Sequence, residues 1–208
     1  MLFKAMIRGL FTIGWMIAII TAPKAEPIRI VAFGDSLSAG YELPEADGFP
    51  KQLEAALKAK GYDVIVENSA VSGDTSTGGL ERLDWSIADG TKLVILELGA
   101  NDALRGIDPA LTRSNIDEMI KRLKTRSIQI VLAGMLAPPN MGQAYALPFN
   151  AIYPELAAQY DVPLYPFFMD GVITEASLKL SDGLHPNAKG VAVIVSGILP
   201  FIEAELKK

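Results

Sequence analysis

The stretch Ile30-Val31-Ala32-Phe33-Gly34-Asp35-Ser36-Leu37-Ser38 is an apolar run that stops at a glycine and then presents a serine. A run of this kind, bounded by turn residues, is typical of a strand that is buried on both faces. Four further runs follow it along the chain. The predicted strands cover residues 28–34, 63–68, 92–99, 128–134 and 162–165.

Longer amphipathic segments separate these strands and predict helices over 49–60, 77–88, 109–125, 146–160 and 187–207. Gly61 supplies a stop after the first helix, Asp108-Pro109 supplies a cap and a first-turn proline, and Asn187 can cap the last helix. Strands that alternate with helices predict a parallel five-stranded sheet with helices on both faces. We therefore expect a three-layer α/β/α sandwich that forms one domain over residues 26–208.

The ligand site of such a fold lies beyond the carboxyl ends of its strands. Ser36 follows the first predicted strand, and the segments 69–73, 99–102 and 136–140 follow the second, third and fourth. We expect all four to meet at one edge of the sheet.

Residues 1–25 differ from the rest of the chain. Lys4 and Arg8 precede an uncharged run of 14 residues, 9–22, which suits a signal peptide (roughly 7–15) and is short of the roughly 20 that span a bilayer. This pattern predicts a signal peptide and export, to a bacterial periplasm or out of the cell, and no integral membrane span in the mature chain. An uncleaved amphiphilic anchor is the alternative.

Removal of residues 1–25 would leave 16 Lys and Arg against 24 Asp and Glu, a formal charge of −8 in place of −5. This acidity, with no cluster of basic residues, argues against nucleic acid and against anionic lipid headgroups as partners. A neutral or zwitterionic apolar small molecule is easier to accommodate.

The chain has no cysteine and one histidine. Disulfides, thiolate nucleophiles, cysteine-ligated zinc and any site that needs two imidazoles are therefore excluded. Neither an Asp-rich loop nor a phosphate-binding glycine pattern points to a carboxylate-only metal site. We expect no metal and no cofactor.

The single histidine, His185, follows Asp182 by three residues in Asp182-Gly183-Leu184-His185-Pro186. Imidazole exchanges protons near neutral pH, and a carboxylate can fix its tautomer. A serine hydroxyl needs such a base to become a nucleophile. Ser36 is the candidate, although it has no G-x-S-x-G elbow around it.

Acyl transfer also needs hydrogen-bond donors for the oxyanion of its tetrahedral intermediate. Gly73 can expose its backbone N–H, Asn101 carries a side-chain amide, and the backbone N–H of Ser36 is a third donor. Each of these residues alone is more simply explained as a turn former or helix cap. Together with His185 and Asp182, they supply a nucleophile, a base with its carboxylate and two further donors. Independent turn residues would have no reason to provide this combination.

Four blocks of this sequence resemble those of the SGNH, or GDSL, hydrolase family. They are Gly34-Asp35-Ser36-Leu37-Ser38, Gly73, Gly99-Ala100-Asn101-Asp102 and Asp182-Gly183-Leu184-His185-Pro186. The segments 68–76, 98–106, 150–154 and 161–169 are similar to the exported arylesterase, lysophospholipase and acyl-CoA thioesterase branch, over nearly the whole mature chain.

The resemblance implies a catalytic triad of Ser36, Asp182 and His185, and an oxyanion hole of Ser36, Gly73 and Asn101. It also implies that no cofactor is needed. For the fold, it implies a flavodoxin-like sheet with strand order 2-1-3-4-5. Asp35 and Asp102 are expected to brace their loops, and Arg105 has no assigned role.

Residues 136–149 are rich in Met, Leu, Pro and aromatic side chains, which makes them too irregular for a helix and too apolar for a free loop. One interpretation is that this segment packs on the core. The other is that Leu136, Pro138, Met141 and Leu147 line an acyl-chain groove beside Ser36.

The leading hypothesis is a serine esterase whose partner is a small-molecule acyl ester or thioester, hydrolysed through an acyl-enzyme on Ser36. A carbohydrate O-acetylesterase on the same scaffold is the alternative within enzymes. A catalytically silent envelope binding protein is the alternative from another class.

Overall fold

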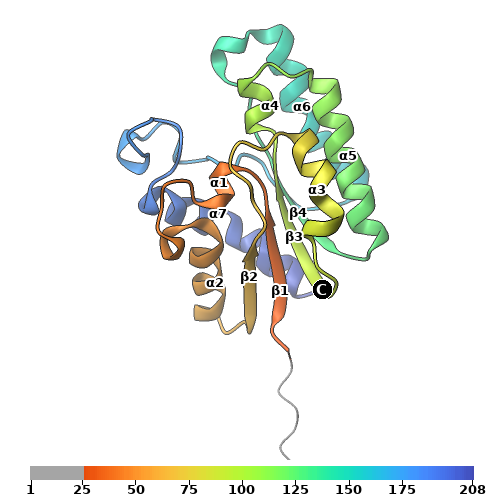
Figure 1. Cartoon of the computed structure of the whole chain (residues 1–208), viewed down its shortest axis with the longest axis vertical. Coiled ribbons are helices and arrows are strands. Elements are labelled where there is room, and N and C mark those ends of the chain that lie inside the picture. Colours follow the sequence, from red (N-terminus) through yellow and green to blue (C-terminus); the bar gives the residue numbers. More distant parts are fainter. Residues whose placement is uncertain (1–25) are drawn as a thin grey trace, which may run out of the picture.

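The computed structural model describes residues 26–208, which form a five-stranded parallel sheet with helices on both faces (Figure 1). The strand order is β2-β1-β3-β4-β5, as predicted. The predicted signal peptide, residues 1–25, lies outside the described residues. The strands are β1 (Ile28–Phe33), β2 (Val64–Asn68), β3 (Thr91–Glu97), β4 (Gln129–Ala133) and β5 (Leu164–Tyr165).

Two groups of helices cover the two faces of this sheet (Figure 1). On one face α2 (Phe49–Ala59) packs against α7 (Ala188–Leu206), and on the other α5 (Pro109–Thr125) packs between α3 (Ser76–Ser86) and α6 (Gln143–Tyr160). Two short helices follow strand ends, α1 (Ser36–Ala39) after β1 and α4 (Ala100–Leu104) after β3. The 3₁₀ turns are η1 (Glu45–Asp47), η2 (Pro139–Met141) and η3 (Ala176–Leu178).

The core lies on both sides of the three central strands. Side chains 30–33 of β1, 93–96 of β3 and 130–133 of β4 are all buried, which explains why these strands appear in the sequence as continuous apolar runs. Parallel pairing places Ala32 of β1 beside Ile95 of β3, and Ile95 beside Val131 of β4. The carboxyl ends of the strands therefore lie at one edge.

The prediction for the segment before 150 is wrong in one respect. Residues 143–149 are helical, because α6 begins at Gln143 rather than at Ala146. None of residues 143–145 is buried, so no apolar periodicity marks this first turn in the sequence, and two prolines, Pro148 and Pro154, lie further along the helix. Its buried face outweighs the hydrogen bonds that they remove, since buried residues recur at helical spacing along it, namely Phe149, Ile152, Tyr153, Leu156 and Ala157.

The remaining predicted helices agree with the structure to within one or two residues, whereas α1 and α4 were not predicted. Helices of four or five residues have no periodicity that a sequence can reveal. Over residues 26–208, none of the helices combines the length and the apolar character that crossing a bilayer requires.

Candidate active site

Ser36 is the first residue of α1, directly beyond the carboxyl end of β1. Asp35 caps this helix, since its Oδ1 accepts a hydrogen bond of 3.0 Å from Leu37 N. Gly40 ends the helix after one turn and has a left-handed φ of 80°. The half-buried Ser36 is thus positioned between the N-cap at Asp35 and the left-handed turn at Gly40.

His185 lies in the loop before α7, and its Nε2 is 2.8 Å from Ser36 Oγ. On the other side of the ring, Nδ1 is 2.6 Å from Asp182 Oδ2. Asp182 Oδ1 accepts hydrogen bonds from the backbone N–H groups of Leu184 and His185. The hydrogen bond with the His185 ring, followed by the one from the backbone N–H of Leu184, lowers the pKa of Asp182 to about 2.

An ionised Asp182 accepts only, so the hydrogen of the neutral imidazole belongs on Nδ1 and Nε2 faces Ser36 as an acceptor. Hydroxyl, imidazole and carboxylate in this order can transfer a proton away from a serine oxygen and stabilise the resulting imidazolium. The structure therefore brings Ser36, His185 and Asp182 together in the geometry of a triad.

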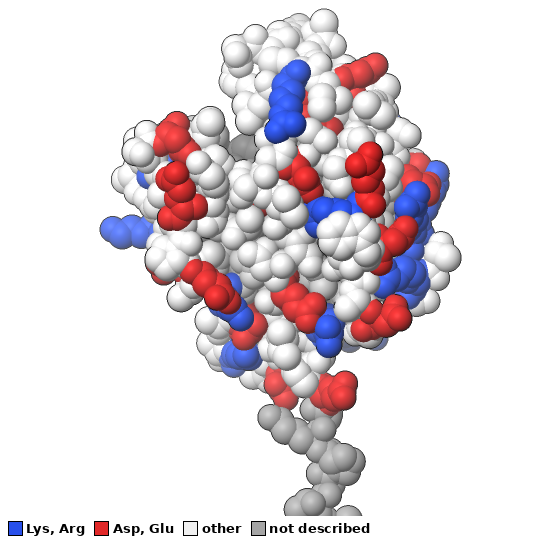
Figure 2. All heavy atoms as spheres, in the orientation of Figure 1, with Lys and Arg blue, Asp and Glu red and all other residues white. Residues whose placement is uncertain are grey.

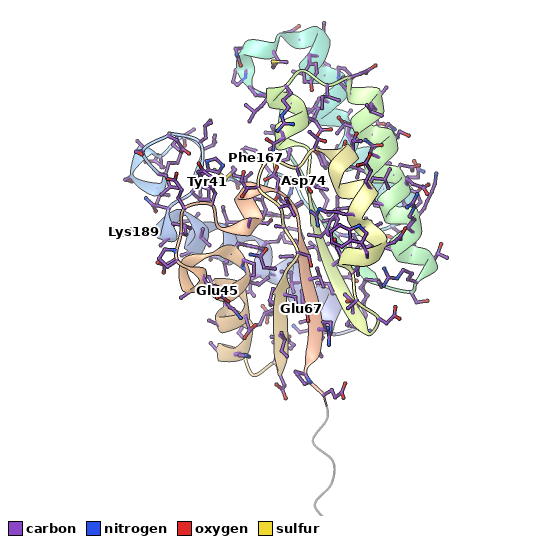
Figure 3. The ribbon with its side chains drawn as sticks, in the orientation of Figure 1. Tyr41, Glu45, Glu67, Asp74, Phe167 and Lys189 are labelled. Carbon is purple, nitrogen blue, oxygen red and sulfur yellow. The ribbon has the colours of Figure 1, made fainter. Side chains whose placement is uncertain are left out.

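Tyr41 covers one side of the imidazole. The two ring centroids lie 4.4 Å apart with an angle of 33° between their planes. In Figure 3, Tyr41 lies with Phe167 at the upper end of the sheet. Sequence reasoning missed Tyr41 because no motif marks it, and the contact depends on the chain reversal at Gly40.

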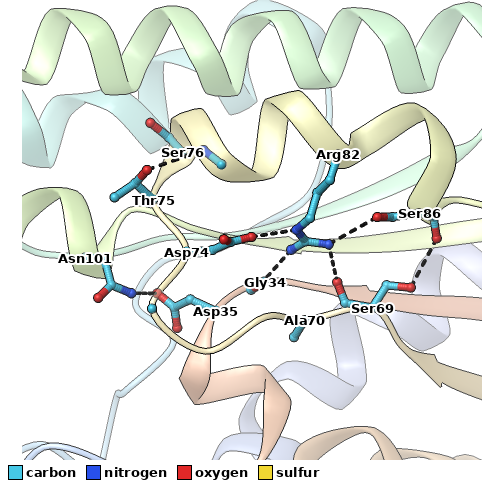
Figure 4. A network of polar contacts seen from close by, with 12 residues as sticks. Gly34, Asp35, Ser69, Ala70, Asp74, Thr75, Ser76, Arg82, Ser86 and Asn101 are labelled. Carbon is cyan, nitrogen blue, oxygen red and sulfur yellow. Dashed lines mark hydrogen bonds and ion pairs between the residues drawn. The ribbon is translucent and has the colours of Figure 1, made fainter.

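Gly73 lies on the loop that follows β2, and Asn101 lies in α4, the short helix that follows β3. Gly73 has a φ of +87°, which favours glycine, and its carbonyl accepts a hydrogen bond of 2.8 Å from Arg105 Nη2. Asn101 Nδ2 donates to Asp35 Oδ2 at 3.0 Å (Figure 4). The two predicted donor residues of the oxyanion hole are thus each fixed by a neighbour, Gly73 by Arg105 and Asn101 by Asp35.

Asp102 is fully buried and joins three elements. Its carboxylate accepts from the backbone N–H and the hydroxyl of Ser76 at the start of α3, and from Thr112 Oγ1 of α5. Asn115 completes the cluster by donating to Ser76 Oγ. These bonds brace α4, the short helix that carries Asn101.

Glu97, at the end of β3, is a buried carboxyl that sequence reasoning missed. Its Oε2 accepts from Asp35 N at 3.2 Å and from Ser38 Oγ at 2.7 Å, whereas its Oε1 has no partner among residues 26–208. Burial, together with the charge of Asp35, raises the pKa of Glu97 well above its ordinary range. Burial also raises the pKa of Asp35 to about 6. At neutral pH we assign the proton of this pair to Glu97.

A cleft of about 730 Å³ opens beside Ser36 and His185. Its lining is mostly apolar, and none of the residues that form it is Asp, Glu, Lys or Arg. Besides Ser36 and His185, the lining contains Leu37, Tyr41, Ser72, Gly73, Ala100, Asn101, Ala103, Leu104, Met135, Leu136, Ala137, Pro138, Pro139, Phe167, Met169, Ile173 and Leu184.

The four residues predicted to line a groove divide into two pairs. Leu136 and Pro138 line the cleft, but Met141 and Leu147 do not. Leu147 lies on the solvent-facing side of α6 and is 69% exposed. Met141 ends η2, with its terminal methyl group beside Gly106. In Figure 2 this part of the surface, at the top of the view, carries few charged side chains.

Within the part of the chain that the structure describes, no three His, Cys, Asp or Glu side chains are grouped so as to hold a metal ion.

A serine, a histidine and an aspartate at the carboxyl edge of a five-stranded parallel sheet define a serine hydrolase of the α/β/α type. A profile of the GDSL-like Lipase/Acylhydrolase family matches residues 32–193. The chain therefore belongs to this family, the SGNH hydrolases, and is a serine esterase of that family.

Individual relatives agree with this assignment. The chain is 41% identical over 181 residues to an arylesterase of Vibrio mimicus, covering 86% of this chain and 88% of the relative. It is 36% identical over 172 residues to thioesterase 1/protease 1/lysophospholipase L1 of Escherichia coli K12, covering 82% and 81%. The crystal structure of AlinE4, an SGNH-hydrolase family esterase, superposes with a TM-score of 0.74 at 42% identity, covering 88% and 98%.

The raised pKa of Glu97 predicts a pH dependence of stability. A carboxyl that stays protonated in the folded chain ionises in the unfolded chain above about pH 4.3, so its contribution to stability falls as the pH rises above that value. The substitution Glu97→Gln removes this titration. We expect the free energy of unfolding, measured by urea denaturation, to fall less steeply between roughly pH 5 and pH 8 in Glu97→Gln than in the parent.

Glu81→Gln is the control, because Glu81 is an exposed carboxyl on α3. It should keep the pH slope of the parent. A slope for Glu97→Gln equal to that of the parent would mean that Glu97 is ionised in the folded chain.

Proposed function

We propose that this chain hydrolyses carboxylic esters and thioesters of acyl chains through an acyl-enzyme on Ser36. The observation that carries the proposal is the continuous pair of contacts from Ser36 Oγ to His185 Nε2, 2.8 Å, and from His185 Nδ1 to Asp182 Oδ2, 2.6 Å. Ser36 and His185 also line an apolar cleft.

In the proposed acylation, Ser36 Oγ attacks the carbonyl carbon while its proton passes to His185 Nε2. The tetrahedral intermediate collapses, the bond to the leaving oxygen or sulfur breaks, and His185 returns the proton to the leaving group. Water then loses a proton to His185 and attacks the acyl-enzyme. The carboxylic acid is released, and the proton returns to Ser36. Asp182 stays ionised throughout and holds the imidazolium.

The negative charge on the carbonyl oxygen needs donors during both steps. We assign this role to the backbone N–H groups of Ser36 and Gly73 and to Nδ2 of Asn101, which all line the cleft. One hydrogen of Asn101 Nδ2 is directed to Asp35, and this bond leaves the second hydrogen of the same amide for the oxyanion.

The lining supports an apolar acyl group as the substrate. It holds leucine, methionine, proline and aromatic side chains, and it lacks the charged and amide groups, other than Asn101, that would bind the many hydroxyls of a carbohydrate. Relatives named arylesterase and thioesterase 1/lysophospholipase L1 support aryl esters, thioesters and lysophospholipids as the classes to test. We also propose that residues 1–25 are a signal peptide that directs export to the periplasm or out of the cell.

Covalent labelling tests the nucleophile. A fluorophosphonate probe should modify the parent chain at Ser36, as read by intact mass and peptide mapping. Ser36→Ala should not be labelled, and His185→Gln should be labelled at least about 100-fold more slowly, because the chain holds no second histidine to act as base. A folded parent that remains unlabelled would contradict the esterase proposal and favour a silent binding protein.

A chain-length series tests the acyl groove. In Leu136→Ala we expect kcat/KM for p-nitrophenyl octanoate to fall about 5- to 10-fold through lost apolar contact, with p-nitrophenyl acetate within about twofold of the parent. The matched control is Leu147→Ala, which removes an exposed leucine outside the cleft and should change neither rate. An equal loss on both esters would count against the groove.

A further inference from the structure

We propose that Arg82 is a positioning residue for the oxyanion hole, because it ties the loop that carries Ser36 to the loop that carries Gly73. The inference rests on the proposed function, since it assigns those two loops to the stabilisation of the oxyanion. Arg82 lies on α3, outside the residues that line the cleft, and would act through the loops that it joins.

The guanidinium uses all three of its nitrogens on these loops (Figure 4). Nη2 donates to the carbonyl of Gly34 at 3.0 Å, two residues before Ser36. Nε donates to Asp74 Oδ2 at 2.5 Å, directly after Gly73. Nη1 donates to the carbonyl of Ser69, where the second loop leaves β2, at 2.6 Å. One rigid planar group therefore fixes the relative position of two chain segments.

The surroundings of Arg82 make these contacts strong and specific. Its side chain is 8% exposed, and its guanidinium carbon lies 4.0 Å above the centre of the Phe33 ring in β1. A buried guanidinium needs hydrogen bonds to offset its lost hydration, and here one of them is to the carboxylate of Asp74. A shift of either loop would break a buried charged contact, so both loops are held.

The two donors that depend on these loops come from the backbone. The N–H groups of Ser36 and Gly73 cannot be repositioned by side-chain rotation, so their separation is set by the chain segments alone. Arg105 binds the carbonyl of Gly73 from the exposed side, at 2.8 Å, and Val71 N donates to the carbonyl of Gly34 at 3.0 Å. Arg82 adds a buried side-chain link between the two loops. A misplacement of about 1 Å in a catalytic group can reduce a rate about 100-fold.

The test is Arg82→Lys, which keeps the charge but replaces a planar fork by a single ammonium that cannot serve all three acceptors. For p-nitrophenyl butyrate we expect kcat to fall at least about 10-fold with KM within about twofold of the parent. The affinity for hexylboronic acid, which forms a tetrahedral adduct on serine, should weaken by the same factor as kcat/KM. The affinity for hexanoate, a product-like carboxylate, should stay within about twofold.

Arg122→Lys is the matched control. Arg122 is ion-paired too, with Glu118 and Asp84, but lies on the outer surface of α5 with its side chain 39% exposed. It should match the parent in every measurement. Labelling of Ser36 in the parent tests the proposed function separately, so a parent-like Arg82→Lys in a chain that is labelled defeats this inference alone.

Two results would overturn the proposal. One is a folded Arg82→Lys with kcat and boronic acid affinity within twofold of the parent, and the other is an equal loss of affinity for the boronic acid and for hexanoate. If Arg82→Lys does not fold, Asp74→Asn carries the test, because it keeps the contacts of Arg82 with the two carbonyls and weakens only the contact next to Gly73. A parent-like kcat in Asp74→Asn, or failure of both variants to fold, would assign Arg82 a structural role only.

Discussion

The hydrogen bond between Ser36 Oγ and His185 Nε2 joins residues 149 positions apart. It therefore depends on the fold that brings these two segments together. It exists because β1 ends where the loop before α7 returns to the same edge of the sheet. The left-handed turn at Gly40 reverses the chain after one turn of α1 and brings Tyr41 against the imidazole. Asp182 then holds the imidazole from the far side.

Beneath this surface lies a layer of buried ionisable groups. Glu97 accepts from the backbone of Asp35, Asp35 accepts from Asn101, and Arg82 joins Gly34 to Asp74. In a medium of low polarity each of these contacts is directional and costly to break. The loops at the sheet edge therefore behave as one rigid support, while the cleft above them is lined by apolar side chains that can accommodate an acyl chain.

The sequence was sufficient to predict the fold class and the meeting of Ser36, Gly73 and Asn101, because continuous apolar runs reveal parallel strands and their ends share an edge. The strand order 2-1-3-4-5 was predicted from the family resemblance alone. The sequence was insufficient for Glu97, Arg82 and Tyr41, whose partners are distant in the chain and whose neighbours form no motif. The start of α6 was missed because residues 143–145 are not buried and show no apolar periodicity, and Leu147 and Met141 were placed in the cleft on their apolar character alone.

A crystal structure of the chain after reaction of Ser36 with a phosphonate would test the central claim most directly, since the adduct resembles the tetrahedral intermediate. The account predicts one phosphonyl oxygen within about 3 Å of three nitrogens, the backbone N of Ser36, the backbone N of Gly73 and Nδ2 of Asn101. It also predicts that His185 Nε2 remains beside Ser36 Oγ. A phosphonyl oxygen turned to solvent, or an adduct on another residue, would contradict it.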